Sequence, residues 1–177
     1  MNQKNIKGKV KKYFFDNPTT KLRVREVEQT INVPLPSAIR YCKELEQEKI
    51  FKTEIIGKTK FYTTNKTSFE FTLEKKLYNI RTIYESGLIE HLKKELSNPV
   101  IILFGSYSRG EDIETSDIDL YVETESKKEL ELKKFEKKLK RKIQIFKHKS
   151  IKSVRNPHLM NNIINGIKLN NQIEVFK

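Results

Sequence analysis

The residues 100–106 and 116–122 read VIILFGS and SDIDLYV, and these two runs decide the fold of the second half of the chain. The first run is apolar and rich in β-branched side chains, which predicts a buried strand that ends in a tight turn at Gly105 before a helix. The second run alternates between polar and apolar residues. It therefore predicts a strand with Asp117 and Asp119 on one face and its apolar side chains on the other.

This arrangement is suited to holding phosphates and a divalent cation. Gly105 has no Cβ, so a triphosphate can approach the backbone closely, and the Ser106 hydroxyl and the amides that open the helix can donate hydrogen bonds to it. Asp117 and Asp119 would repel each other without a cation. Because all the available ligands are oxygens, we expect that cation to be Mg²⁺.

Residues 104–111 followed by 116–120 resemble the signature of the minimal nucleotidyltransferases of the DNA polymerase beta superfamily. The shared features are Gly-Ser, a spacer of ten residues and Asp-x-Asp. The resemblance implies a nucleotidyltransferase-type α/β domain with a small mixed sheet over residues 99–177. The pattern after the signature predicts a helix, a strand, a helix and a last strand, at about residues 127–141, 142–147, 157–165 and 173–176.

The resemblance also implies roles for particular residues. Asp117 and Asp119 would be catalytic and would bind two Mg²⁺ ions, while Gly105 and Ser106 would hold the β- and γ-phosphates of an NTP, expected to be ATP. Arg109 is a further candidate for a phosphate contact, although an arginine in a polar loop is equally well explained as a surface residue.

One position departs from the family pattern. Members that catalyse transfer usually carry a third carboxylate on the next strand, and the corresponding residue here is Gln144. An amide oxygen can bind a metal but adds no charge and accepts no proton. Glu123 or Glu174 could substitute, although the sequence places neither within reach. Binding of metal and nucleotide is therefore better supported than turnover.

The first part of the chain, residues 1–66, resembles a winged helix-turn-helix domain. The pattern predicts three helices at about residues 4–15, 24–31 and 36–48, then strands at 50–55 and 60–64 joined by a turn at Gly57. In the third helix we expect a buried stripe of Ile39, Cys42 and Leu45. The outward-facing residues that would then contact nucleic acid are Ser37, Arg40, Tyr41 and Lys43, with Lys58 and Lys60 on the wing reaching phosphates. The alternative is a module for protein docking or dimerisation.

Between these parts, residues 67–98 are predicted to form a helical connector. One helical stripe comprises Leu73, Leu77, Ile80 and Tyr84, and a second, after an interruption at Ser86-Gly87, comprises Leu88, Leu92 and Leu96. The second helix is expected to pack on the sheet that follows. The first helix would brace the two domains. The alternative is that it pairs with a copy of itself, but four apolar positions are too few to indicate a coiled coil.

The amino-acid composition further narrows the possible classes of function. The 177 residues carry a formal net charge of +13, which favours polyanionic partners over a Lys-rich surface that merely confers solubility. The single cysteine, Cys42, cannot form an intramolecular disulfide, and the three scattered histidines offer no metal-ligand spacing. No run is long enough for a signal peptide or a membrane span, so a cytoplasmic protein is expected.

Two functions are consistent with these patterns. The first is an α+β, two-domain enzyme that transfers an NMP from an NTP to a hydroxyl on a nucleic acid or on a protein, such as a toxin partner. The second is a DNA-binding transcriptional regulator whose C-terminal domain binds nucleotide, or merely dimerises, with weak or no catalysis. Gln144 favours the second, and the intact Gly105, Ser106, Asp117 and Asp119 favour the first.

Overall fold

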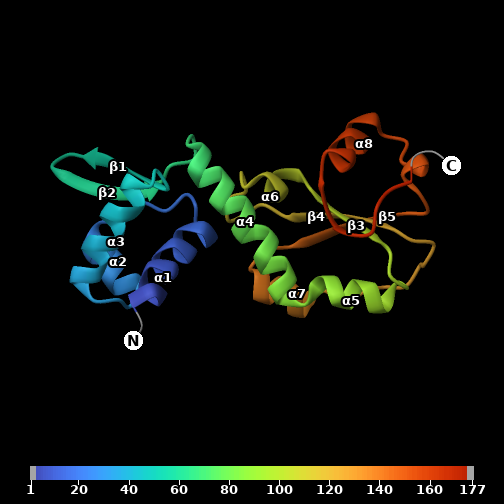
Figure 1. Ribbon diagram of the computed structural model, residues 1–177, viewed down its shortest axis with the longest axis horizontal. Coiled ribbons are helices and arrows are strands. Elements are labelled where there is room, and N and C mark those ends of the chain that lie inside the picture. Colours follow the sequence, from blue (N-terminus) through green and yellow to red (C-terminus); the bar gives the residue numbers. More distant parts are fainter. Residues whose placement is uncertain (1–2, 175–177) are drawn as a thin grey trace. The chain divides into compact units, whose positions relative to one another are not determined.

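The computed structural model describes residues 3–174 and has an α+β fold (Figure 1). The chain divides into two compact units, Met1–Lys75 and Lys76–Lys177. Each unit has its own sheet. Within the described part of the chain, no helix combines the length and apolar character that crossing a membrane requires.

The first unit consists of three helices followed by a β-hairpin: α1 (Gln3–Asp16), α2 (Val24–Ile31), α3 (Leu35–Gln47), β1 (Phe51–Ile56) and β2 (Thr59–Thr64). The elements lie close to where the sequence predicts them. The hairpin strands are antiparallel, in register from Phe51 opposite Thr64 to Ile56 opposite Thr59. Gly57 takes φ +62° in the turn between them, a conformation that glycine adopts without strain.

Aromatic contacts join α1 to the hairpin and to the segment that follows it. The rings of Phe14 in α1 and Phe51 in β1 lie 4.4 Å apart between centroids, and Phe15 meets Phe71 at 5.6 Å. All of these side chains are buried. Contacts of this kind add to the free energy gained by removing the rings from water.

The prediction for α3 was wrong at two positions. Ile39 is 39% exposed, whereas Tyr41, expected on the outer face, is only 4% exposed. The buried stripe follows Ala38, Tyr41, Cys42 and Leu45. At 100° per residue these four lie within one arc of the helix, while Ile39 falls outside it, because spacing by three residues alone drifts around the helix.

Two helices cover the region expected to be a connector: α4 (Phe69–Ser86) and α5 (Leu88–Glu95), separated by Gly87 at φ +83°. The stripe expected on α4 is not its buried face, because Leu73, Leu77 and Tyr84 are 41–54% exposed. The buried face instead carries Phe71, Lys75, Asn79 and Ile83. Two of those four are polar, so hydrophobic periodicity alone could not identify this face.

The second unit is built on a four-stranded mixed sheet in the order β5-β4-β3-β6. Its strands are β3 (Val100–Phe104), β4 (Ile118–Glu123), β5 (Ile143–His148) and β6 (Ile167–Asn170). β3 is antiparallel to both β4 and β6, and β4 is parallel to β5. Short helices connect the strands: α6 (Gly105–Arg109), α7 (Lys133–Leu139), a 3₁₀ turn (Ile151–Ser153) and α8 (Pro157–Ile164).

Both faces of this sheet are covered, and α5 and α8 lie on opposite sides of it in Figure 1. On one face, Leu103 and Leu120 form a cluster with Leu92 of α5 and Phe135 of α7. On the other face, Tyr121 clusters with Ile163 of α8 and with further residues, Ile102, Phe104, Ile151 and Val154. Burial on both faces explains why β3 reads as an uninterrupted apolar run.

Two predicted elements of this unit differ from the structure. The helix expected at residues 127–141 is only α7, because Ser126 and Lys128 donate backbone N–H groups to nearby hydroxyls, and such local bonds compete with a helix. Among the described residues, the last strand is β6 (Ile167–Asn170). Residues 173 and 174 are in no strand, and 175–176 lie outside the described residues.

The revised face of α3 predicts a contrast between two truncations. Leu45→Ala should lower the free energy of unfolding by about 2–5 kcal/mol, because it leaves a cavity at a fully buried position. Ile39→Ala should change it by less than about 1 kcal/mol, since Ile39 is partly in water. Urea unfolding of both variants tests this, and equal losses would contradict the assignment.

Candidate active site

The turn at Gly105 is built around the carboxylate of Asp119. Gly105 has φ +75°, and an ideal Cβ placed on it would lie 2.3 Å from Asp119 Oδ2. No side chain larger than hydrogen fits there while the carboxylate keeps its position. Ser106 follows directly in the first turn of α6.

Strand pairing brings the two halves of the signature together. Phe104, the last residue of β3, pairs with Asp119 in β4, so the Gly-Ser turn and this aspartate meet at the same end of the sheet. Asp117 lies two residues earlier, just before β4 begins. Asp119 is half-buried and Asp117 is exposed. The predicted site residues Gly105, Asp117 and Asp119 are thus gathered in one place.

The electrostatics of this pair favour a cation. Burial raises the pKa of the Asp119 carboxyl above its usual range, and the negative charge of Asp117 raises it further. A bound cation would remove that cost. Across the described residues, no group of three or more His, Cys, Asp or Glu side chains could hold a metal ion. The two carboxylates suit a hard ion such as Mg²⁺, which takes few protein ligands and completes its shell with phosphate oxygens and water.

Strand register places Gln144 next to Asp119. β4 and β5 are parallel, and Asp119 is paired directly with Gln144. Paired residues point to the same face of a sheet, so the Gln144 amide lies beside the carboxylate. The side chain next to Asp119 on the neighbouring strand is therefore neutral and exposed.

Glu123 is not placed to replace the third carboxylate. Glu123 Oε2 accepts hydrogen bonds from the Tyr121 hydroxyl (2.9 Å) and the Ile151 N–H (3.0 Å). It lies four residues beyond Asp119, about 13 Å along the strand at the usual rise. Glu174 lies in no strand.

A buried polar cluster supports the loop between the Gly-Ser turn and Asp117. Asn79 Nδ2 donates to the Tyr107 carbonyl oxygen (2.8 Å) and to Asp112 Oδ1 (2.7 Å). Arg141 lies with its guanidinium 3.6 Å from Asp112 Oδ2. Sequence patterns did not indicate these residues, because they come from three separate segments: α4, the loop and the turn before β5. The only signal in the sequence was that Asp112 is an acidic residue within the ten-residue spacer.

Arg109 is engaged in a surface ion pair. Its Nε donates to Glu111 Oε2 at 2.6 Å, and both side chains are more than half exposed. A phosphate contact would require Arg109 to exchange this partner, and an exposed ion pair of this kind is weak enough to allow that. Its role in binding phosphate stays a prediction.

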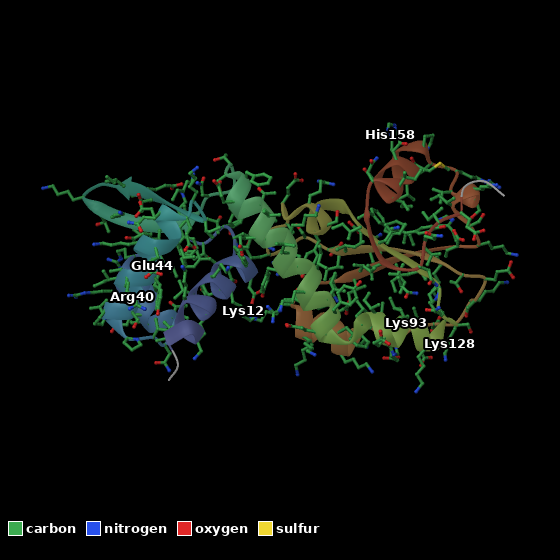
Figure 2. The ribbon with its side chains drawn as sticks, in the orientation of Figure 1. Lys12, Arg40, Glu44, Lys93, Lys128 and His158 are labelled. Carbon is green, nitrogen blue, oxygen red and sulfur yellow. The ribbon has the colours of Figure 1, made fainter. Side chains whose placement is uncertain are left out.

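The structure brings together only some of the residues of the first unit that were predicted to contact nucleic acid. Arg40 and Glu44, both labelled in Figure 2, form an ion pair at 3.4 Å. The Arg40 guanidinium also lies 4.4 Å from the centroid of the Tyr41 ring. Tyr41 is buried, which corrects the prediction that its side chain faces outward. Ser37 is partly buried on α3, while Lys58 is exposed at the hairpin turn.

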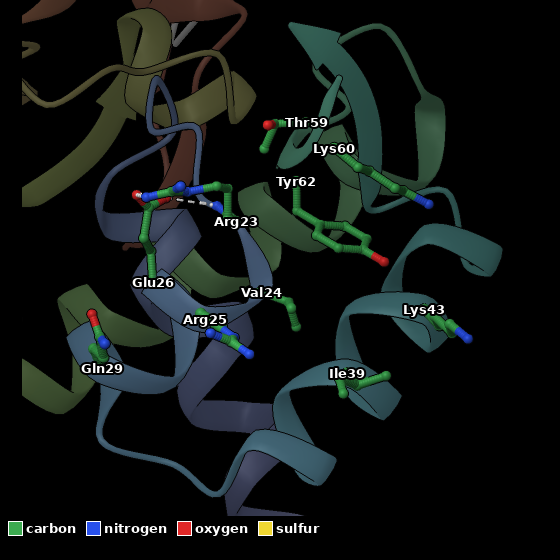
Figure 3. A pocket seen from close by; sticks show the side chains of 10 residues that line it. All are labelled: Arg23, Val24, Arg25, Glu26, Gln29, Ile39, Lys43, Thr59, Lys60 and Tyr62. Carbon is green, nitrogen blue, oxygen red and sulfur yellow. Dashed lines mark hydrogen bonds and ion pairs between the residues drawn. The ribbon is translucent and has the colours of Figure 1, made fainter. Parts of the chain in front are cut away.

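A groove of about 620 Å³ joins two of these candidates, Lys43 and Lys60 (Figure 3). Arg23 and Arg25, at the start of α2, line the same groove and were missed by the sequence analysis. The sequence feature that could have indicated them is the run of basic residues at 21–25, where the second predicted helix begins. Arg23 pairs with Glu26 at 2.6 Å and Lys60 with Glu46 at 3.2 Å.

Comparison with known protein families gives a match. The profile of the family described as Nucleotidyltransferase domain matches residues 85–174. This match covers β3, β4 and β5 together with the Gly-Ser turn and both aspartates. No curated protein and no solved structure matches the chain.

The raised pKa of Asp119 predicts that Asp119→Asn increases the thermal stability of the metal-free protein, by an amount that depends on pH. The native state holds the Asp119 proton more tightly than the unfolded chain does, so wild-type stability falls as pH rises through the native pKa. At pH 7 in EDTA, the variant should melt roughly 1–3 °C higher than wild type, and this difference should shrink towards pH 4.

Glu125→Gln, which removes an exposed carboxylate on the loop after β4, is the matched control and should change Tm by less than about 1 °C at both pH values. Thermal melts followed by circular dichroism give the comparison. A variant that melts lower than wild type at pH 7 would show that the paired carboxylates are not under repulsion.

Proposed function

The chain belongs to the nucleotidyltransferase domain family, and on this basis we propose that it is a Mg²⁺-dependent enzyme that transfers an NMP from an NTP, expected to be ATP, to an acceptor hydroxyl. The observation that most directly supports this function is the contact between the Asp119 carboxylate and the Gly105 turn, with Asp117 beside it. A carboxylate pair directly against a phosphate-binding turn places metal and triphosphate together.

Each site residue then has a defined task. Asp117 and Asp119 would hold Mg²⁺, Gly105 would allow the triphosphate close to the backbone, and Ser106 would donate hydrogen bonds to its oxygens. When bound, the cation neutralises phosphate charge and activates the attacking hydroxyl. The protein's own contribution is to position the reactants, which the buried cluster of Asn79, Asp112 and Arg141 supports by fixing the loop.

Gln144 supports a second candidate function. Its place beside Asp119 is where the family's third carboxylate is expected, and an amide cannot accept the proton of the attacking hydroxyl. The alternative is a DNA-binding transcriptional regulator whose C-terminal unit binds metal and nucleotide with little or no transfer.

The first unit is proposed to be a winged helix that binds nucleic acid. Three helices and a hairpin with a basic groove support this assignment. Arg25 and Lys43 are exposed at that groove and would contact phosphates, with Lys58 and Lys60 on the hairpin. Ser37 and Arg40 are expected to face the DNA, whereas buried Tyr41 is not proposed as a contact. The acceptor class includes nucleic acids and proteins, such as a toxin partner, and we expect a cytoplasmic protein.

Label transfer distinguishes the two functions. Purified protein incubated with Mg²⁺ and each of the four α-³²P-labelled NTPs, with added nucleic acid or protein, should transfer label from one preferred NTP. Asp117→Asn/Asp119→Asn should reduce transfer by at least about 100-fold, because it removes the metal ligands. Gln144→Asp should increase it, since a third carboxylate can orient the acceptor hydroxyl.

Label only from Gln144→Asp would favour the regulator. Nucleotide binding that survives the double Asn variant unchanged would contradict the site assignment itself.

A further inference from the structure

Positive charge in the nucleotidyltransferase unit is concentrated in one short segment. Seven of the ten residues 133–142 are Lys or Arg and one is acidic, whereas the rest of residues 99–177 carries nine basic and ten acidic side chains. The segment comprises α7 and the turn into β5. The charge of this unit is therefore a local feature and not a general property of its surface.

This basic segment forms one wall of a groove that reaches the candidate active site. The groove has a volume of about 520 Å³, and its other wall is the loop at residues 114–117, so Asp117 lies in its lining. Lys133 and Lys137 line it from α7. They are four residues apart, which places them on the same side of the helix. Gly105 and Ser106 do not line this groove.

Two of the basic side chains along the groove, Lys133 and Lys137, remain available to a ligand. Glu136, the one acidic residue of the segment, accepts the Ile143 N–H at 3.1 Å and lies 3.8 Å from the Lys142 ammonium group. Lys133 and Lys137 are exposed and form no ion pair within the described residues. A polyanion could therefore bind both ammonium groups without displacing a carboxylate from either of them.

We propose that this groove binds the phosphodiester backbone of a nucleic-acid acceptor and directs its terminal hydroxyl towards Asp117 and Asp119. The inference rests on the proposed transferase function and names its acceptor class. In the transfer, the acceptor oxygen forms a bond to the α-phosphorus of the NTP, and the bond from that phosphorus to the bridging oxygen breaks. Pyrophosphate leaves and the hydroxyl proton passes to water.

The lining favours a nucleic acid over a protein. It contains no apolar side chain, whereas the centre of a protein interface is apolar and poor in lysine. Lysines spaced along a groove are the usual means of holding a phosphate backbone without reading its sequence. The triphosphate of the NTP is expected at Gly105 and Ser106, outside this groove, so the lysines are not needed to hold it.

Binding of a fluorescein-labelled twelve-nucleotide single-stranded RNA to the full chain tests the proposal. Fluorescence anisotropy at several KCl concentrations gives Kd and its salt dependence. Lys133→Gln/Lys137→Gln should weaken binding roughly tenfold and reduce the slope of log K against log[KCl] by about 1.4, at about 0.7 per phosphate contact. Lys133→Arg/Lys137→Arg should bind as wild type does, because it keeps both charges.

The matched control is Lys152→Gln/Lys168→Gln, which removes the same charge away from the groove. Lys152 lies in the 3₁₀ turn beyond the far end of β5, and Lys168 lies on β6 at the opposite edge of the sheet. This pair should change Kd less than twofold. All tests are repeated in an Arg25→Gln/Lys43→Gln background, so that binding by the first unit does not mask the result.

Several outcomes would overturn the proposal. Equal losses in the groove pair and the control pair would indicate a general charge effect. Weaker binding of a labelled oligoglutamate of equal charge, with RNA binding unchanged, would indicate an acidic protein acceptor. Loss of Mg·ATP affinity in the groove pair would assign the lysines to the nucleotide. RNA binding needs no turnover, so it reports on the groove even if the wild type transfers no label.

Discussion

The packing of the Asp119 carboxylate against Gly105 is the constraint on which the candidate site depends. Because a Cβ at residue 105 would lie 2.3 Å from Asp119 Oδ2, the carboxylate can occupy this place only if residue 105 is glycine. The same contact holds a half-buried negative charge beside Asp117, which raises the pKa of Asp119. The fold thus maintains an unfavourable charge arrangement that a cation would relieve, as is common where a structure serves binding and not only stability.

Much of this site could be predicted from the sequence. The apolar run ending at Phe104 and the alternation around Asp119 each define a strand, and the ten-residue spacer is long enough for one helical turn and a loop. The family resemblance implied that Gln144 stands where the third carboxylate is expected, and the register of β4 and β5 pairs Gln144 directly with Asp119. These features are local, or they depend on neighbouring strands in which alternating side chains define the two faces. Local patterns of this kind are what a single sequence indicates best.

What could not be predicted depends on contacts between distant residues. Asn79 and Asp112 are 33 positions apart, and nothing in either segment indicates that they share a buried hydrogen bond. On α4 the buried face includes Lys75 and Asn79, so an apolar stripe led to the wrong side of the helix. The groove beside α7 arises because a lysine-rich helix meets the loop at residues 114–117, and charge alone gave no sign of where that helix would lie.

The most direct test of the account is a crystal structure of the protein with Mn²⁺ and a non-hydrolysable ATP analogue, with anomalous scattering used to locate the metal. The account predicts an anomalous peak about 2.0–2.3 Å from carboxylate oxygens of both Asp117 and Asp119. It also predicts the triphosphate against Gly105 and Ser106. An ordered nucleotide bound elsewhere, with no metal at the two aspartates, would contradict the central claim that the Gly105 turn and this carboxylate pair form a nucleotide site.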